Sequence, residues 1–296
     1  MKRTILALLV ASVFVSCAGY QKLRRPIATP LDNLLELNVR IMWVAAHPDD
    51  ESIAGPILSK AAAYGDPIYM LVLNHGDGGE CNLPEGCLPT LADVRGKELA
   101  KVAELYGATL QHEWYWNAPL PTETFPKRHE IARKWRREGG DPTVVVAKAI
   151  RDFRPDVVFA LSPIRGGTGH PEHQLAGRFA MAGVRLAASG DADLPGKPYR
   201  VPHCYHIVNK APLFRLFGLD DPLPYTERFD VRQPCKNGMT CAETGAENTK
   251  PHRTQIRDMG AMRKILKLLD YLYLYRIDPF TEVLDPYEPV EEGGMT

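Results

Sequence analysis

Residues 39–51 read Val-Arg-Ile-Met-Trp-Val-Ala-Ala-His-Pro-Asp-Asp-Glu and join an apolar run to a strongly polar turn. The run Val39–Ala45 predicts a buried strand. A histidine and three carboxylates at the end of such a strand are unfavourable unless they bind something. His47 and Asp50 lie three residues apart on a turn that enters a helix, so their side chains can converge on one point. Asp49 lies between them and can face a different atom.

A second polar cluster follows the apolar run Val157–Leu161 and contains His170 and His173. A single histidine near a strand is usually structural, and carboxylates at a helix start usually serve as caps. Two such clusters together favour a site, because ligands bind beyond the carboxyl ends of strands in open α/β sheets. Two imidazoles and one carboxylate around an open position are a common ligand set for catalytic zinc. The pattern therefore predicts a hydrolytic metal centre.

The remaining chain alternates between expected strands and helices, which predicts an α/β fold with a mainly parallel sheet. Its active site should lie at the carboxyl ends of the strands. We expect strands at 39–45, 68–73, 110–116 and 157–161, and helices at 51–64, 91–106, 142–153, 171–188 and 256–275. The run 201–208 should add a further strand.

Composition argues against several classes of partner. The 296 residues carry 36 basic and 36 acidic side chains, so the formal net charge is zero. This balance gives no electrostatic reason to expect binding to nucleic acid or to an anionic membrane surface. With 45% apolar residues, the chain is suited to one globular domain preceded by a leader.

The first 18 residues predict export. Lys2 and Arg3 precede the apolar run 5–15, and small residues follow it. The apolar run is too short for a transmembrane helix. Cleavage before a lipidated Cys17 and ordinary cleavage after Ala18 both remain open; we favour lipidation, although Phe14 is unusual three residues before such a cysteine. We expect a signal peptide at 1–18, a linker at 19–38 and the catalytic domain at 39–296, located in the periplasm or cell envelope.

The cysteine pattern agrees with an oxidising compartment. Cys81/Cys87 and Cys235/Cys241 each enclose five turn-rich residues, which predicts two local disulfides. Cross-pairing and a four-thiolate metal site are the alternatives, although the latter usually has closer Cys-x2-Cys spacing. Cys204 should be a buried free thiol.

Five motifs in this order resemble the PIG-L/LmbE-like zinc-dependent N-deacetylases, which remove acetyl groups from amino sugars and related compounds. The motifs are Ala46–Glu51, Gly76–Gly79, Arg95–Glu98 with Gly107, His170–His173 and His252–Gln255. Two features depart from the family pattern. Glu172 stands where an aspartate is more common, and Cys81–Cys87 looks like an insertion that affects access to the site.

The resemblance implies a Rossmann-like three-layer fold and a role for each residue of the two clusters. One Zn²⁺ per chain would be held by His47, Asp50 and His173, lowering the pKa of a water in the open position toward ~7. Asp49 would act as general base. A protonated His170 would stabilise the oxyanion and help to protonate the departing amine. Spacing alone allows His170 and His173 to exchange roles.

Substrate contacts are implied less directly. The family places an arginine at the position of Arg95 near sugar hydroxyls or phosphate, whereas a surface pair with Glu98 is the alternative. His252 and Gln255 match a motif near the site. The aromatic residues Trp114–Trp116 could stack on a sugar ring or belong to the core.

These observations predict an exported zinc hydrolase that deacetylates an N-acetylglucosamine-type sugar or glycoconjugate. The expected partner is a substrate with an N-acetyl group, with no nucleic acid, and with membrane contact only through a lipid at Cys17. One alternative is a zinc hydrolase of another amide or an ester. The other is a glycan-binding lipoprotein without catalytic activity.

Overall fold

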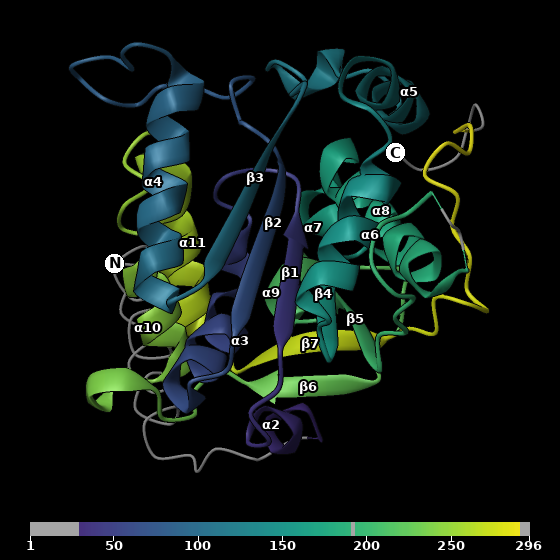
Figure 1. Ribbon diagram of the computed structural model, residues 1–296. Helices are drawn as coiled ribbons and strands as arrows, with labels where there is room; N and C mark the ends of the chain where they lie inside the picture. The colour runs from purple at the N-terminus through teal and green to yellow at the C-terminus, as the bar shows by residue number, and fades with distance from the viewer. Residues whose placement is uncertain (1–29, 191–192, 291–296) are drawn as a thin grey trace, which may run out of the picture.

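One mixed sheet organises the computed structural model, which describes residues 30–190 and 193–290 (Figure 1). The strand order is β3-β2-β1-β4-β5-β7-β6. Neighbouring strands from β3 to β5 are parallel, whereas β7 is antiparallel to both β5 and β6. The strands are β1 (Ile41–Ala45), β2 (Ile68–Asn74), β3 (Thr109–Tyr115), β4 (Val157–Leu161), β5 (His203–Val208), β6 (Glu227–Asp230) and β7 (Tyr271–Arg276). The predicted α/β fold with a mainly parallel sheet is confirmed.

Helices cover both faces of the sheet and complete three layers (Figure 1). On one face lie α3 (Glu51–Tyr64), α4 (Leu91–Tyr106), α10 (Cys241–Asn248) and α11 (Ile256–Leu268). On the other lie α5 (Arg128–Gly139), α6 (Pro142–Phe153) and α8 (Pro171–Ala188). The shorter helices are α2 (Pro30–Leu35), α7 (Gly166–Gly169), α9 (Pro212–Leu216), η1 (Thr122–Thr124) and η2 (Lys236–Gly238).

The central strand β1 contributes to the cores on both sides of the sheet. Trp43 packs into the core beside α3 and α4, whereas Met42 and Val44 pack into the core beside α6 and α8. Successive side chains point to opposite faces of a strand, so a strand covered on both faces is apolar at every position. All five β1 residues are buried for this reason.

The expected helix over 256–275 is wrong in its second half. Helix α11 ends at Leu268, and Tyr271–Arg276 form β7 instead. The sequence Tyr-Leu-Tyr-Leu-Tyr-Arg has the aromatic content and alternation typical of a strand, and Leu272 and Leu274 are buried. The strand pairs with β5 on one side and β6 on the other, so the sheet overrides the apparent helical spacing.

The segment predicted as a linker is partly structured. Its described residues include α2, in which Leu31 and Leu35 are fully buried in the core beside α3. This helix therefore packs as part of the domain. The predicted signal peptide and Cys17 lie outside the described residues. Within the described ranges, no helix is both long enough and apolar enough to cross a membrane.

Both predicted disulfides are present. Cys81 is bonded to Cys87 and Cys235 to Cys241, and Cys204 is a buried free thiol. The first loop rests on the segment before α11, where Asn82 donates its backbone N–H to the carbonyl oxygen of Thr254 at 3.0 Å.

The strand order places the two polar clusters together. The chain moves from β1 to β2 and β3 on one side, and from β4 to β5 on the other. The order therefore reverses between β1 and β4, and a ligand crevice forms at the carboxyl ends of strands on either side of such a switch point. His47 follows β1 and His170 follows β4, so both reach this crevice.

Candidate metal centre and active site

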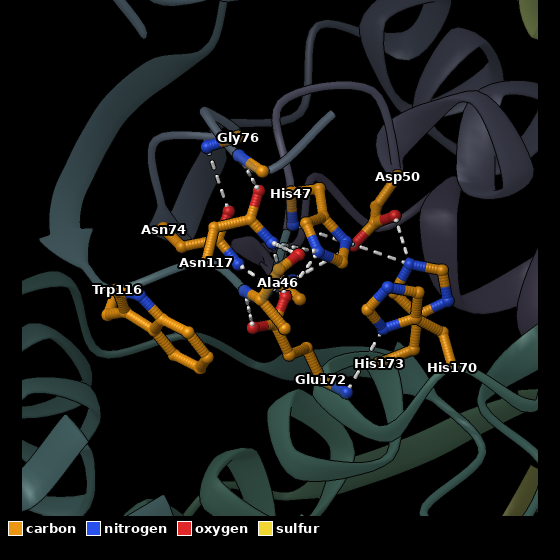
Figure 2. Close-up of polar contacts among 12 residues, drawn as sticks. Ala46, His47, Asp50, Asn74, Gly76, Trp116, Asn117, His170, Glu172 and His173 are labelled. Atoms are coloured by element: carbon orange, nitrogen blue, oxygen red, sulfur yellow. Dashed lines mark hydrogen bonds and ion pairs between the residues drawn. The ribbon is translucent and has the colours of Figure 1, made fainter. Parts of the chain in front are cut away.

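Three predicted metal ligands converge at the switch point (Figure 2). His173 Nε2 lies 2.9 Å from His47 Nδ1 and 2.9 Å from Asp50 Oδ1. His47 Nδ1 lies 3.7 Å from Asp50 Oδ2. Asp50 is fixed because its Oδ2 accepts the backbone N–H groups of Ala46 and His47, each at 2.9 Å. All three side chains are buried, so their polar atoms face one another rather than bulk water.

The donor set fits a zinc ion. Ligands at 2.0–2.1 Å from a tetrahedral zinc are about 3.3–3.4 Å apart, and the separations of 2.9–3.7 Å bracket that value. His173 Nδ1 lies 2.8 Å from the carbonyl oxygen of Gly166, to which it donates. His47 Nε2 donates to Glu172 Oε2 at 2.6 Å. In neutral imidazoles the remaining nitrogens are both lone-pair acceptors, and they repel each other and Asp50 unless a cation lies between them.

The charges around this point favour a cation. Burial alone would lower the pKa of His47, but hydrogen bonds and charge from Asp50 and Glu172 raise it to about 10. Burial would raise the pKa of the Asp50 carboxyl, but the imidazoles of His173 and His47 outweigh it and hold the pKa well below its usual range. Both shifts indicate a negative local potential, which a proton or a metal ion can satisfy.

Glu172 orients His47 from the side opposite the candidate metal position (Figure 2). Its fully buried carboxylate accepts Asn117 Nδ2 at 2.7 Å, Asn74 Nδ2 at 3.2 Å and the backbone N–H of Ala118 at 2.8 Å. Such carboxylate–histidine contacts fix the ring and its tautomer. Sequence reasoning treated Glu172 only as a substitution within a motif, and no signal in the sequence indicated Asn117.

Replacing Glu172 by glutamine should weaken zinc affinity about 10–100-fold, the usual effect of losing a group that supports a metal ligand. The substitution keeps the size of the side chain but removes the charge that holds the His47 N–H. Competition titration with a chelator measures the affinity. Glu104→Gln, on the exposed surface of α4, is the matched control. Equal zinc affinity in Glu172→Gln and the native protein would contradict this role.

Asp49 lies on the wall of the same crevice and is held by Arg95. Arg95 Nη2 donates to Asp49 Oδ2 at 2.7 Å, and Nη1 donates to the carbonyl oxygen of Gly76 at 2.8 Å. Arg95 is buried, so the alternative of a surface pair with Glu98 does not apply. Burial raises the pKa of the Asp49 carboxyl despite the opposing charge of Arg95. A carboxylate with a raised pKa is a better proton acceptor than an unperturbed one.

His170 is the N-cap of α8 and also borders the crevice. Its Nδ1 accepts the backbone N–H of Glu172 at 3.2 Å, so the neutral ring carries its proton on Nε2. Burial, together with the imidazoles of His47 and His173, holds the pKa of His170 far below its usual value. The structure therefore favours a neutral hydrogen-bond donor over the protonated form expected from the resemblance.

These groups line one cavity of about 260 Å³. Arg95 and Gln255 also line it, and Gln255 is held by the carbonyl oxygen of Glu80 at 2.8 Å. The apolar part of the wall consists of Ile53, Ala118, Leu120, Phe125, Met259 and Met262.

Two other sequence-predicted contacts lie elsewhere. His252 does not line this cavity, because its side chain is fully buried with Nε2 2.7 Å from Glu51 Oε1. The residues Trp114–Trp116 are divided: Tyr115 packs in the core, whereas Trp114 is 63% exposed and stacks near His75. None of the three aromatic side chains is part of the cavity wall.

Residues 42–184 match the family model described as "PIG-L: GlcNAc-PI de-N-acetylase". Among curated proteins, the chain is similar to the 1D-myo-inositol 2-acetamido-2-deoxy-alpha-D-glucopyranoside deacetylase of Segniliparus rotundus. The two are 31% identical over 188 residues, which are 56% of each chain. The match thus spans little more than half the length of that relative.

Solved structures share the fold at low identity. N,N'-diacetylchitobiose deacetylase from Pyrococcus horikoshii superposes with a TM-score of 0.51 at 17% identity, covering 87% of this chain and 96% of that one. The 4-carboxy-2-hydroxymuconate hydratase GalB from Pseudomonas putida superposes with a TM-score of 0.60 at 16% identity, covering 83% and 100%. The same fold therefore carries more than one kind of chemistry.

Proposed function

We propose that the chain, whose residues 42–184 belong to the PIG-L family, is a zinc-dependent N-deacetylase. Its proposed substrate is an N-acetylglucosamine-type sugar or glycoconjugate. The main support for this activity is that His47, Asp50 and His173 converge at one point. Asp49 lies beside them in the same cavity. The named activity of the curated relative, which acts on a 2-acetamido sugar, supports this substrate class.

The proposed reaction divides the proton transfers among the chain's own residues. Zinc bound by His47, Asp50 and His173 would supply Lewis acidity toward the amide carbonyl and lower the pKa of water. Asp49 accepts the proton of the attacking water while Arg95 holds the carboxylate in place. The Nε2–H of neutral His170 donates a hydrogen bond to the developing oxyanion. Asp49 then returns its proton to the amine as the C–N bond breaks, which leaves a carboxylic acid and a free amine.

A zinc hydrolase of another amide or an ester is the second candidate, because the converging ligands and Asp49 would activate water toward either kind of carbonyl. A glycan-binding protein without catalytic activity is a weaker one, since both proposed proton-handling groups, Asp49 and His170, line the cavity.

Release of free amine from a panel of N-acetylated sugars, with matched esters and non-sugar amides, distinguishes these functions. The proposal predicts turnover of 2-acetamido sugars that requires zinc. Turnover confined to the esters or the non-sugar amides would contradict the proposed substrate, and no turnover by fully zinc-loaded protein would contradict the activity.

Export is part of the proposal, supported by the leader-like residues 1–18 and by two disulfides. With a lipid on Cys17 the protein partitions with membranes, and Cys17→Ser releases it or blocks processing. Recovery of the native chain from the cytosol with all cysteines reduced would contradict export.

Opening the Cys81–Cys87 disulfide should raise KM for the sugar substrate by a larger factor than it changes the number of zinc ions bound per chain. The loop contacts the segment that ends at Gln255, and Gln255 lines the cavity. The paired substitution Cys81→Ser/Cys87→Ser tests this, with Cys235→Ser/Cys241→Ser as the control outside the cavity wall. Each loop is short, so each bond should contribute about 2–3 kcal/mol to the free energy of unfolding. An unchanged KM in the Cys81/Cys87 variant would contradict the proposed role of the loop.

A further inference from the structure

A second cavity, of about 580 Å³, adjoins the active-site cavity. Phe125, Thr168 and His170 border both cavities, so the second one adjoins the space beside the metal centre. We call it the basic cavity, because Lys127, Arg128 and Arg165 line it.

In the described part of the chain, Arg128 and Arg165 contact neutral acceptors. Within residues 30–190 and 193–290, none of the three cations forms an ion pair. Arg128 donates Nη1 to the neutral Gln174 Oε1 at 3.1 Å, and Arg165 donates Nη2 to the carbonyl oxygen of Gly218. The buried Nε atoms of both arginines have no acceptor among the described residues. Glu123 is the single carboxylate residue on the wall. The basic cavity therefore carries an excess of positive charge.

Two helices begin at this cavity. Helix α5 begins at Arg128 with Lys127 as its N-cap, and α8 begins at Pro171 with His170 as its N-cap. The N-terminus of a helix carries partial positive charge and disfavours basic side chains there. At α5 the carboxylate of Glu130, which accepts the backbone N–H of Lys127 at 2.8 Å, offsets part of this charge. Burial and the charge of Arg178 lower the pKa of Arg128 to about 10, outweighing the opposite effect of Glu288. A bound anion would relieve both unfavourable effects.

We propose that the basic cavity binds an acidic group, a carboxylate or phosphate, carried by the aglycone of the sugar substrate. The inference rests on the proposed function, because it places the 2-acetamido sugar at the metal centre. The acidic group then reaches past His170 and Phe125 toward Arg128 and Arg165, which select substrates by charge and do not take part in the hydrolysis.

Glycosides that differ only in charge test this selection. N-acetylglucosamine is linked to alkyl chains of graded length that end in a carboxylate or in the isosteric, neutral carboxamide, with a phosphate series as a third arm. At the best chain length, kcat/KM for an anionic series should exceed that for the carboxamide by about tenfold or more, and added salt should reduce the ratio. The anionic series with the higher kcat/KM shows whether the preferred acidic group is a carboxylate or a phosphate.

Arg128→Gln and Arg165→Gln should each reduce this ratio several-fold, which a general loss of activity would not do. Lys127→Gln alters an exposed side chain and gives a third variant, which cannot disturb the core. Arg200→Gln, whose guanidinium lies over Phe280 outside both cavities, is the matched control and should keep the native ratio. Ratios in all three variants equal to the native ratio would overturn the assignment.

Calorimetric binding of the corresponding free amines separates this inference from the proposed function. The protein could hydrolyse none of the glycosides and yet bind the anionic amines more tightly through Arg128 and Arg165. Anion binding by the basic cavity would then be supported, and the proposed deacetylase activity would be refuted. The protein could instead hydrolyse charged and neutral glycosides equally and bind their amines equally. The proposed activity would then be supported, and anion binding by the basic cavity would be refuted.

Discussion

Replacing Asp49 by asparagine should lower kcat by about 10²–10⁴-fold, the usual contribution of a positioned proton-transfer group. The protein should still bind zinc, because Asp49 contacts Arg95 and lies outside the set of converging ligand atoms. The amide of asparagine keeps the shape of the side chain but cannot accept the proton of the attacking water. Steady-state kinetics at matched zinc content measure the effect.

Asp258→Asn is the control for Asp49→Asn. Asp258 also lines the cavity, but it is an exposed residue on α11 and has no proposed role in proton transfer. Its substitution should change kcat little. Native turnover in zinc-loaded Asp49→Asn would refute the mechanism even if the protein is a zinc hydrolase.

Loss of one metal ligand should release the ion. Asp50→Ala and His173→Ala each remove one of three protein donors, so zinc should fall from about one ion per chain to a small fraction of that after dialysis. Elemental analysis measures it. Asp50→Asn is a milder variant, because an amide oxygen can still accept the N–H groups of Ala46 and His47.

His203→Ala serves as the control for these ligand variants, since this histidine lies at the start of β5 and outside the cavity wall. Circular dichroism shows whether each variant keeps its fold. Folded Asp50→Ala and His173→Ala that both retain full zinc would rule out this ligand set.

Local sequence patterns predicted the elements that surround the site. The helices at 51–64, 91–106, 142–153 and 171–188 and the strand at 157–161 occur with the expected bounds. Two of these helices end at Gly65 and Gly107, which have positive φ and are typical helix stops. The apolar runs at 39–45 and 157–161 predicted buried strands, and the alternation of strands and helices predicted a mainly parallel sheet.

The elements that were missed depend on distant partners. Strand β7 forms because β5 and β6 pair with it, and short β6 has no strong pattern of its own. Helix α5 is mostly polar and buries only Ile131, Ala132 and Trp135, so its sequence lacks a broad apolar face. Propensity is a weak guide where tertiary pairing decides the outcome.

In the site too, local sequence predicted some features, whereas others depend on residues that are distant in sequence. The turn after β1 and the helix start after β4 carried recognisable residues, and the structure brings His47, Asp50 and His173 together. The contacts that orient them join residues far apart in sequence: Glu172 to His47, and Arg95 to Asp49. A motif records which residue is present but not what it touches, which is why His252 matched a family pattern and yet is buried against Glu51.

A zinc titration of activity tests whether hydrolysis requires one zinc ion at the site. Metal-free protein is prepared with a chelator, and the rate of amine release from an N-acetylglucosamine glycoside is measured as zinc is added back. We predict no activity without metal, a linear rise, and a plateau at about one zinc per chain, the capacity of a single site with three protein ligands. Full activity in the metal-free protein, or no amine release at any zinc content, would rule out zinc-dependent deacetylation.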